Sequence, residues 1–187
     1  MIEQEQVVNG INVSGLHYTI NLIRKNPGLA RFQFRAANRW LGGTRNQATV
    51  KGFYGAGKED ETRRQAYVFD EDEPSVLLGS DKGASPVEYV LVALSGCLTT
   101  TLVEQAAVRG IKLDSVESKL EGDVDVRGFL GLADNVRRGF ENIRVTFRIK
   151  SNAPVERLRE LVELAQKRSP VYDIVTNSTP VKVTLET

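Results

Sequence analysis

Residues that bind metals through sulfur or nitrogen are almost absent from this sequence. Its 187 residues include one cysteine, Cys97, and one histidine, His17. A single cysteine excludes a disulfide within the chain, and the two residues fall short of the four ligands that structural zinc takes. We therefore expect no metal, no bound cofactor and no disulfide framework, and we assign His17 a structural role.

An excess of charge of one sign is also missing. The chain carries 25 Lys and Arg against 24 Asp and Glu, which gives a net charge of +1. Proteins that bind nucleic acids usually show a basic excess or a basic stripe, so we expect no nucleic-acid partner. Four acidic residues gather in "FDEDEP", residues 69–74, but they lack the glycine-punctuated spacing of a calcium loop. We interpret this segment as a solvated acidic turn.

Signals for membrane targeting are lacking as well. The first ten residues, "MIEQEQVVNG", contain two glutamates and no continuous apolar run, so we expect no signal peptide. The most apolar segment is interrupted by Glu88, Ser95, Gly96 and Glu104, so we expect no transmembrane helix. Together with the unpaired cysteine, these features predict a cytoplasmic protein without a membrane partner.

What the sequence does contain is a clearly marked long helix over residues 85–110. Ser85 and Glu88 form the S-x-x-E pattern of a capping box, and Pro86 suits the first helical position. Arg109 and Gly110 are typical of a helix end. Leucine and valine repeat at helical spacing on more than one side, which predicts a central helix covered by other elements.

The remaining elements form an α+β pattern. We expect a helix over 13–25 and short strands between 30 and 78. "WLGG", residues 40–43, is interpreted as a turn, and "GAGKEDETRR", residues 55–64, as a polar connection. Two alternating strands, 116–127 and 143–150, carry acidic and basic outer faces that suit an antiparallel pair. Further helices follow Pro154 and Ser169, and a last strand is expected at 179–186. We predict a helical extension, 1–29, and a main domain, 30–187.

Cys97 stands in the middle of the long helix, on its apolar stripe, and two interpretations are open. A buried free cysteine commonly acts as a small apolar residue. The neighbours Ser95, Gly96 and Thr99–Thr101 are small or hydroxylated, and they leave room either for a ligand or for a closely packed helix. A reactive thiol needs a cationic partner from elsewhere, because the helix dipole fades within the first turn. Arg39 and Arg45 are candidates.

Several of these segments together resemble the OsmC-like family of osmotically inducible and organic hydroperoxide resistance proteins. They are "SPVEYVLVALSGC", "RGIKLDSVESKLEGDVDV", "IRVTFRI" and the "SPV" before the last segment, within residues 30–187. The resemblance implies an α+β homodimer with intertwined subunits and central helices packed back to back. It also implies active sites at the subunit interface, where a peroxidatic cysteine reduces organic hydroperoxides.

Residue by residue, the resemblance places Cys97 at the peroxidatic position. The resolving cysteine of the family is replaced by Ser169, which cannot form a disulfide. The assisting glutamate falls at Val87, next to Glu88, and the assisting arginine falls at Arg45, with Arg39 as a second candidate. On this basis we predict Cys97, Arg45 and Glu88 as the catalytic residues, although helix capping also explains Glu88.

The resulting functional prediction is a thiol peroxidase with one cysteine that requires an external thiol reductant. Its substrates would be organic hydroperoxides or hydrogen peroxide. One alternative is a non-catalytic protein that binds a small apolar ligand at the dimer interface. Another is a dimer that serves only as a scaffold. The predicted helix at the N-terminus could cover the pocket, extend the dimer interface or shield a sheet edge.

Overall fold

The computed structural model describes residues 6–186, and residues 1–5 and 187 lie outside the described part. The chain divides into two compact units. The first is formed by Ser14–Tyr89, and the second by Gln6–Val13 with Val90–Thr187. Both units combine helices with antiparallel strands, which confirms the predicted α+β class. The domain limits at 1–29 and 30–187 stay a prediction, and Met1–Glu5 of the extension fall outside the described residues.

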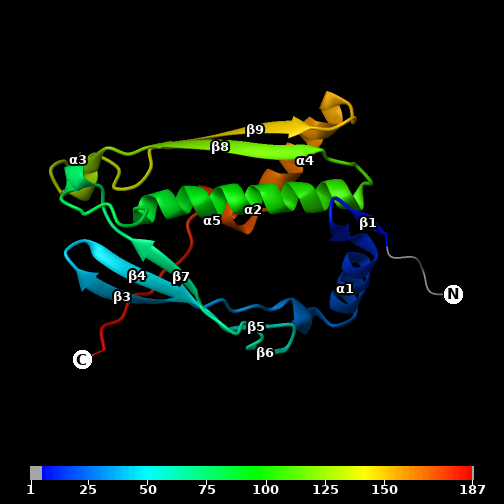
Figure 1. Cartoon of the computed structure of the whole chain (residues 1–187), viewed down its shortest axis with the longest axis horizontal. Helices are drawn as coiled ribbons and strands as arrows, with labels where there is room; N and C mark the ends of the chain where they lie inside the picture. Colours follow the sequence, from blue (N-terminus) through cyan, green and yellow to red (C-terminus); the bar gives the residue numbers. More distant parts are fainter. Residues whose placement is uncertain (1–5, 187) are drawn as a thin grey trace. The chain divides into compact units, whose positions relative to one another are not determined.

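The first unit is built from one helix and short strands (Figure 1). Helix α1 covers Val13–Lys25, as predicted, and a single 3₁₀ turn, η1, follows at Pro27–Ala30. Strands β3 (Ala37–Gly42), β4 (Arg45–Val50) and β7 (Tyr67–Glu71) form a sheet in that order. Strands β5 (Phe53–Gly55) and β6 (Lys58–Asp60) form a separate hairpin, and a second 3₁₀ turn, η2, covers Ser75–Leu77.

Two predicted loops of this unit are shorter than expected. Trp40–Gly42 continue strand β3, and only Gly43 and Thr44 separate it from β4. The polar connection at 55–64 contains β6, which pairs with β5 in antiparallel register. Both differences have the same physical reason, because two residues suffice to reverse an antiparallel chain and the flanking residues are then free to pair.

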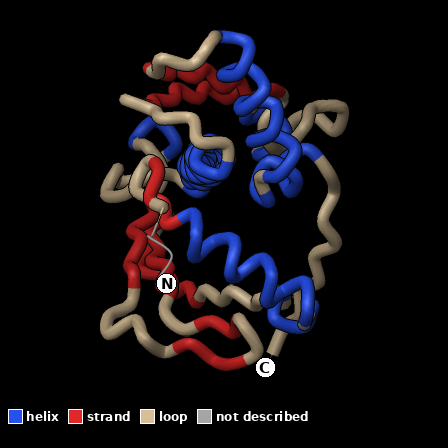
Figure 2. Tube along the Cα trace, turned by 90° about the vertical axis from the view of Figure 1, so that its right-hand side faces the viewer, coloured by secondary structure: helices blue, strands red, loops and turns tan. Residues whose placement is uncertain are grey.

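The second unit is organised around α2, Pro86–Val108, of which Val90–Val108 belong to it. Strands β8 (Ser115–Asp123) and β9 (Asn142–Lys150) run along this helix, as Figure 1 shows. In Figure 2 the helix is seen end-on beneath the strand pair, with α4 (Val155–Arg168) at its side. The fully enclosed core joins α2 to α4 and consists of Leu94, Leu98, Leu102, Ala106, Leu161 and Ala165.

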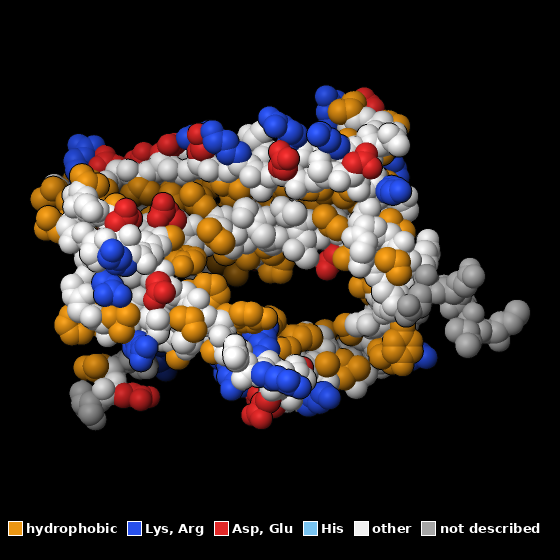
Figure 3. All heavy atoms as spheres, in the orientation of Figure 1, with side chains coloured by type: hydrophobic (Ala, Val, Ile, Leu, Met, Phe, Trp, Pro, Cys, Tyr) orange, Lys and Arg blue, Asp and Glu red, His pale blue; other side chains and the backbone are white. Residues whose placement is uncertain are grey.

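The two long strands pair as their alternating pattern predicts. Ser115 lies opposite Lys150 and Asp123 opposite Asn142, in antiparallel register without a shift. Apolar side chains such as Val145 and Phe147 pack toward the core, while charged side chains cover the other face. That charged face forms the upper edge of the molecule in Figure 3. Glu117 pairs with Arg148 at 3.7 Å, so the expected charge complementarity is present.

The first of these strands ends earlier than predicted. β8 stops at Asp123, whereas the alternation continues in the sequence to Arg127. The side chain of Asp125 accepts a hydrogen bond from the backbone N–H of Arg127 and so caps a short helix, α3, at Val126–Phe129. A local bond between side chain and backbone competes with strand pairing here and prevails.

The predicted last strand is not formed within the described residues. After α5 (Pro170–Thr176), residues 177–186 have no assigned secondary structure. Val181, Val183 and Leu185, the side chains expected on one face of that strand, are 82%, 89% and 88% exposed. The prediction was wrong for the single chain, since alternation makes a strand only where a neighbouring strand supplies hydrogen bonds.

The N-terminal extension is not purely helical. Before α1, strands β1 (Val7–Val8) and β2 (Ile11–Asn12) form a small hairpin. Its turn is Asn9-Gly10, and both residues have positive φ, 54° and 76°. Asn-Gly is the residue pair that such a turn favours. The Asn9 side chain donates to the carbonyl of Ile111 and accepts from the N–H of Leu113, both at 2.9 Å.

Helix α2 also corrects the expectation that no segment is long and apolar enough to cross a membrane. It has 23 residues and contains an 18-residue window with a mean hydropathy of 1.5. The interrupting residues Ser95 and Gly96 are uncharged and lower this mean only slightly. The central helix of a globular core meets the same criteria, so length and composition do not assign α2 to a membrane.

Candidate functional site

The candidate site is centred on Cys97, in the middle of α2. The flanking residues Leu94 and Leu98 are each 2% exposed and anchor this part of the helix in the core. Cys97 itself is only half-buried, and its thiol is free. It is therefore not a fully enclosed apolar residue.

A second residue comes to this sulfur from the junction between α4 and α5. The Ser169 hydroxyl donates a hydrogen bond to the Cys97 sulfur, with Oγ and Sγ 3.1 Å apart. Helix α5 begins after Ser169 because Pro170 suits the first helical position and the serine Oγ caps the helix by accepting from the Tyr172 N–H. Ser169 is 2% exposed. The structure thus joins two residues that lie 72 positions apart.

An apolar groove adjoins this pair. It has a volume of about 630 Å³ and lies between α2, β9 and α5. Leu94, one helical turn before Cys97, and Tyr172, which bonds to Ser169, both line it. The lining also includes the apolar residues Val90, Ile143, Val145, Ile174 and Val175, with Arg137 and Glu141 as its charged members. An alkyl or acyl chain is the chemical class that such a lining suits.

A comparison with known protein families identifies the family of this chain. The sequence model of the family described as OsmC-like protein matches residues 79–184, more than half of the chain and all of the site described above. The chain belongs to the OsmC-like family. No curated protein matches the sequence.

Solved structures agree with the family at the level of the fold. The chain is similar to the OsmC-like protein of Mycoplasma pneumoniae, with a TM-score of 0.60 and 16% identity over 78% of this chain and 89% of that one. It is also similar to the organic hydroperoxide resistance protein OsmC of Legionella pneumophila. That match has a TM-score of 0.55 and 17% identity, over 76% of this chain and 88% of that one.

The other predicted site residues of this OsmC-like protein lie in the first unit. Arg45 begins strand β4 and is exposed, and Arg39 on β3 donates to the Gln47 side chain at 2.8 Å. Glu88 stands in the first turn of α2 and accepts from the Ser85 N–H at 2.8 Å, which confirms the predicted capping box. The assignment of Arg45 and Glu88 as assisting groups of Cys97 stays a prediction.

Sequence reasoning missed a carboxylate that accepts five hydrogen bonds. Asp72 belongs to the "FDEDEP" segment, and the expected solvated turn is wrong at this residue, which is 1% exposed. Its oxygens accept from the hydroxyls of Thr44 and Ser80 at 2.6 and 2.7 Å. They also accept from the backbone N–H groups of Glu73, Ser80 and Lys82. The signal available was the pair Ser80 and Lys82 in a glycine-flanked loop, which offers several donors at short spacing.

These hydrogen bonds determine the charge state of Asp72. The hydroxyls of Thr44 and Ser80 hold the pKa of its carboxyl well below the usual range, although burial acts in the opposite direction. The carboxylate fastens the turn between β3 and β4 to the loop that precedes α2. In that loop Gly79 approaches the backbone of Glu73 so closely that a Cβ atom would collide with it. Asp72 is thus a structural centre, fully occupied by donors.

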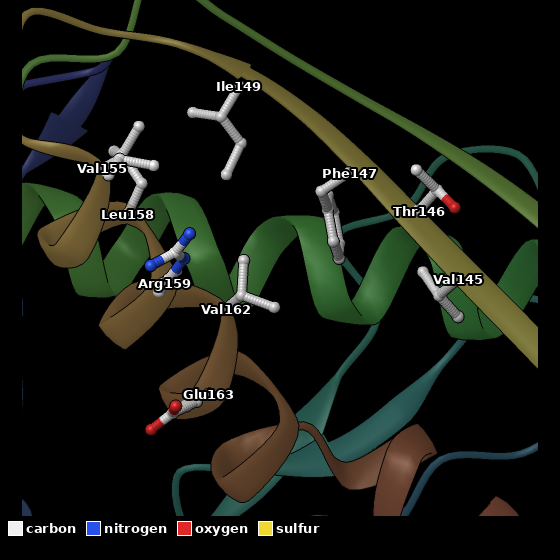
Figure 4. A pocket seen from close by; sticks show the side chains of 9 residues that line it. All are labelled: Val145, Thr146, Phe147, Ile149, Val155, Leu158, Arg159, Val162 and Glu163. Atoms are coloured by element: carbon white, nitrogen blue, oxygen red, sulfur yellow. The ribbon is translucent and has the colours of Figure 1, made fainter.

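A second groove lies farther along β9 and is shown in Figure 4; Val145 lines both grooves. It has a volume of about 550 Å³ and is bounded by β9 and α4. Val145, Phe147 and Ile149 project into it from the strand, and Val155, Leu158 and Val162 from the helix. Its charged members, Arg159 and Glu163, come from α4. The described residues that line it include no cysteine, histidine or serine.

Proposed function

We propose that this OsmC-like protein is a thiol peroxidase with a single reactive cysteine, and that it acts in the defence against organic hydroperoxides or hydrogen peroxide. The observation that carries the proposal is the half-buried residue Cys97, whose sulfur accepts a hydrogen bond from a buried hydroxyl beside an apolar groove. The similarity to the organic hydroperoxide resistance protein OsmC of Legionella pneumophila supports the same role.

The reaction proceeds in two stages. The Cys97 thiolate attacks the outer oxygen of the hydroperoxide, the O–O bond breaks, and the alkoxide leaves and takes up a proton to become an alcohol. The sulfur, now a sulfenic acid, has been oxidised by two electrons. An external thiol then attacks this sulfur and displaces water, and a second thiol releases Cys97 together with a disulfide of the reductant. The external thiol is required because the chain contains no second cysteine.

The proposal includes a homodimer in which the α2 helices of two copies pack against one another. Val92 is 59% exposed, and Ala93, Gly96 and Thr100 continue the same exposed stripe along α2. A stripe of small and apolar residues on a long helix is suited to close packing against a second helix. The assisting roles of Arg45 and Glu88 belong to this proposal too, with either residue supplied by the same chain or by the second copy.

The decisive experiment compares the wild-type protein with Cys97→Ser. Each is incubated with cumene hydroperoxide and excess dithiothreitol, and the loss of peroxide is followed. We expect turnover only with the wild type, together with a sulfenic acid that dimedone traps and mass spectrometry detects. Equal rates for the two proteins, without a trapped adduct, would refute the peroxidase.

A second candidate function is favoured by the groove between α2, β9 and α5. If Cys97 only lines a binding site, an apolar molecule should remain with the protein through purification and appear in native mass spectrometry. Leu94→Gln, which places an amide in the lining, should then release that molecule. Peroxide turnover that depends on Cys97 and occurs without any retained molecule would exclude this alternative.

A further inference from the structure

We infer that Ser169 is a catalytic residue, because its hydroxyl stabilises the Cys97 thiolate by direct hydrogen bonding. This inference rests on the proposed function and deepens it. The activating group of the Cys97 sulfur is then the Ser169 hydroxyl, which contacts that sulfur in the structure. Where the family resemblance implies a second cysteine, this chain uses a hydroxyl for a different task.

The hydrogen bonds of Ser169 have a defined direction. The Ser169 Oγ accepts from the backbone N–H of Tyr172 at 3.1 Å. A hydroxyl has one proton to donate, and with the N–H of Tyr172 aimed at the oxygen, that proton points to the Cys97 sulfur, 3.1 Å away. A thiolate has no proton of its own to donate, so this orientation suits the charged sulfur.

The hydrogen bond from Ser169 to the Cys97 sulfur forms in an environment that strengthens it. Ser169 is 2% exposed, so little water competes for its hydroxyl. Hydrogen bonds to charged groups are roughly twice as strong as bonds between neutral groups, and they favour the charged form of the acceptor. The chain from the Tyr172 N–H to the hydroxyl and on to the sulfur is also polarised in one direction, which strengthens its members. The buried hydroxyl is therefore a donor that binds a charged sulfur more strongly than a neutral one.

The sequence holds Ser169 in this position for a reason independent of Cys97. Pro170 and the N-cap hydrogen bond define the start of α5, and Ala165 in the buried core accepts the Ser169 N–H at 2.9 Å. The hydroxyl is consequently fixed before a substrate arrives. Preorganised donors of this kind stabilise charge without reorganisation during the reaction.

The test uses alkylation of Cys97 by iodoacetamide, which reports the thiolate without requiring peroxide chemistry. At pH 7 we expect Ser169→Gly to be alkylated about 3- to 10-fold more slowly than the wild type. Loss of the hydrogen bond lowers the thiolate population of Ser169→Gly by a larger factor than this. The remaining thiolate is more basic and therefore more nucleophilic, which offsets part of the loss in rate. Glycine keeps most of the capping stability, so the variant should fold. Ser169→Thr restores a hydroxyl and should recover most of the rate.

Thr101→Val is the matched control. Its hydroxyl is also buried near Cys97, but it donates to the Cys97 backbone carbonyl at 2.8 Å and not to the sulfur. We expect its alkylation rate to match the wild type. The deficit of Ser169→Gly should also shrink as the pH rises and the thiol ionises in every variant, a trend that altered packing does not produce. Equal rates for Ser169→Gly and the wild type at pH 7 overturn the inference. So does an equal loss in Thr101→Val.

The outcome is separable from that of the proposed function. Slow alkylation of Ser169→Gly combined with no peroxide turnover by the wild type would keep the role of Ser169 and remove the peroxidase. Alkylation of Ser169→Gly at the wild-type rate, combined with peroxide turnover that depends on Cys97, would keep the peroxidase and remove the role of Ser169.

Discussion

At the scale of single residues, Asp72 shows how a charged side chain becomes part of the interior. Its carboxylate is enclosed, and five donors from Thr44, Glu73, Ser80 and Lys82 surround it. An isolated buried charge is costly, but a fully hydrogen-bonded one can organise the loops that supply its donors. Because it joins the turn before Arg45 to the loop before α2, the arrangement of both depends on one ionised group.

We expect Asp72→Asn to unfold at a lower urea concentration than the wild type at pH 7, because the amide offers hydrogens where the site supplies donors. The pKa of Asp72 is lower in the folded protein than in the unfolded chain. The stability it contributes is therefore complete above the unfolded value, about 3.9, and is lost as the pH falls toward the folded one. The difference between the two proteins should narrow below about pH 4.

The control for this prediction is Asp81→Asn in the same loop. Asp81 is exposed and has a φ of 54°, a conformation that asparagine tolerates well. Its urea midpoint should match the wild type at every pH. A midpoint for Asp72→Asn that equals the wild type at pH 7 would show that the enclosed carboxylate contributes nothing to folding.

At the scale of elements, the sequence predicts best where local signals and packing agree. Periodicity and caps predict the bounds of α1, the long helix α2 with its capping box of Ser85 and Glu88, and the antiparallel pairing of β8 with β9. The contact between Ser169 and the Cys97 sulfur could not be predicted in this way, because it depends on how α4 and α5 pack on α2. The early end of β8 at Asp123 was missed because a cap at Asp125 outweighs four further residues of alternation, 124–127.

The N-terminal hairpin gives a prediction at this scale. Asn9→Gly keeps the positive φ of the turn and removes both side-chain hydrogen bonds to Ile111 and Leu113. The loss leaves a backbone carbonyl and a backbone N–H without these partners. We expect a decrease of about 1–3 kcal/mol in the free energy of unfolding, measured by urea denaturation.

The comparison variant for the hairpin is Asn21→Ala on α1. Its side chain is exposed and accepts only from Arg24 one turn away. Surface substitutions of this kind change the free energy of unfolding by less than about 0.5 kcal/mol. Should the two variants lose equal stability, Asn9 would not be what holds the extension to the connection between α2 and β8.

At the scale of the whole molecule, two of the places where large apolar side chains are exposed on the single chain bear on the proposed dimer. One is the stripe on α2 that includes Val92, and the other is the C-terminal segment with Val181, Val183 and Leu185. Large contiguous apolar patches on a soluble protein commonly mark an interaction site. A homodimer would cover the α2 stripe, and it could also supply the neighbouring strand that the alternating C-terminal segment lacks in one copy.

Gly96 allows the dimer to be tested without disturbing the fold of one copy. A Cβ atom at this position meets no other atom within 4 Å, so Gly96→Leu fits the single chain. In a monomer, replacing glycine inside a helix should raise stability by roughly 0.5–1 kcal/mol. If the α2 stripe packs on a second copy, the added side chain must instead separate the helices. We expect sedimentation equilibrium to show a dimer for the wild type and a monomer for Gly96→Leu.

Gln166→Leu adds the same side chain to an exposed position on α4 and should remain a dimer. A wild-type monomer, or a Gly96→Leu dimer with increased stability, would contradict the back-to-back arrangement of the two α2 helices.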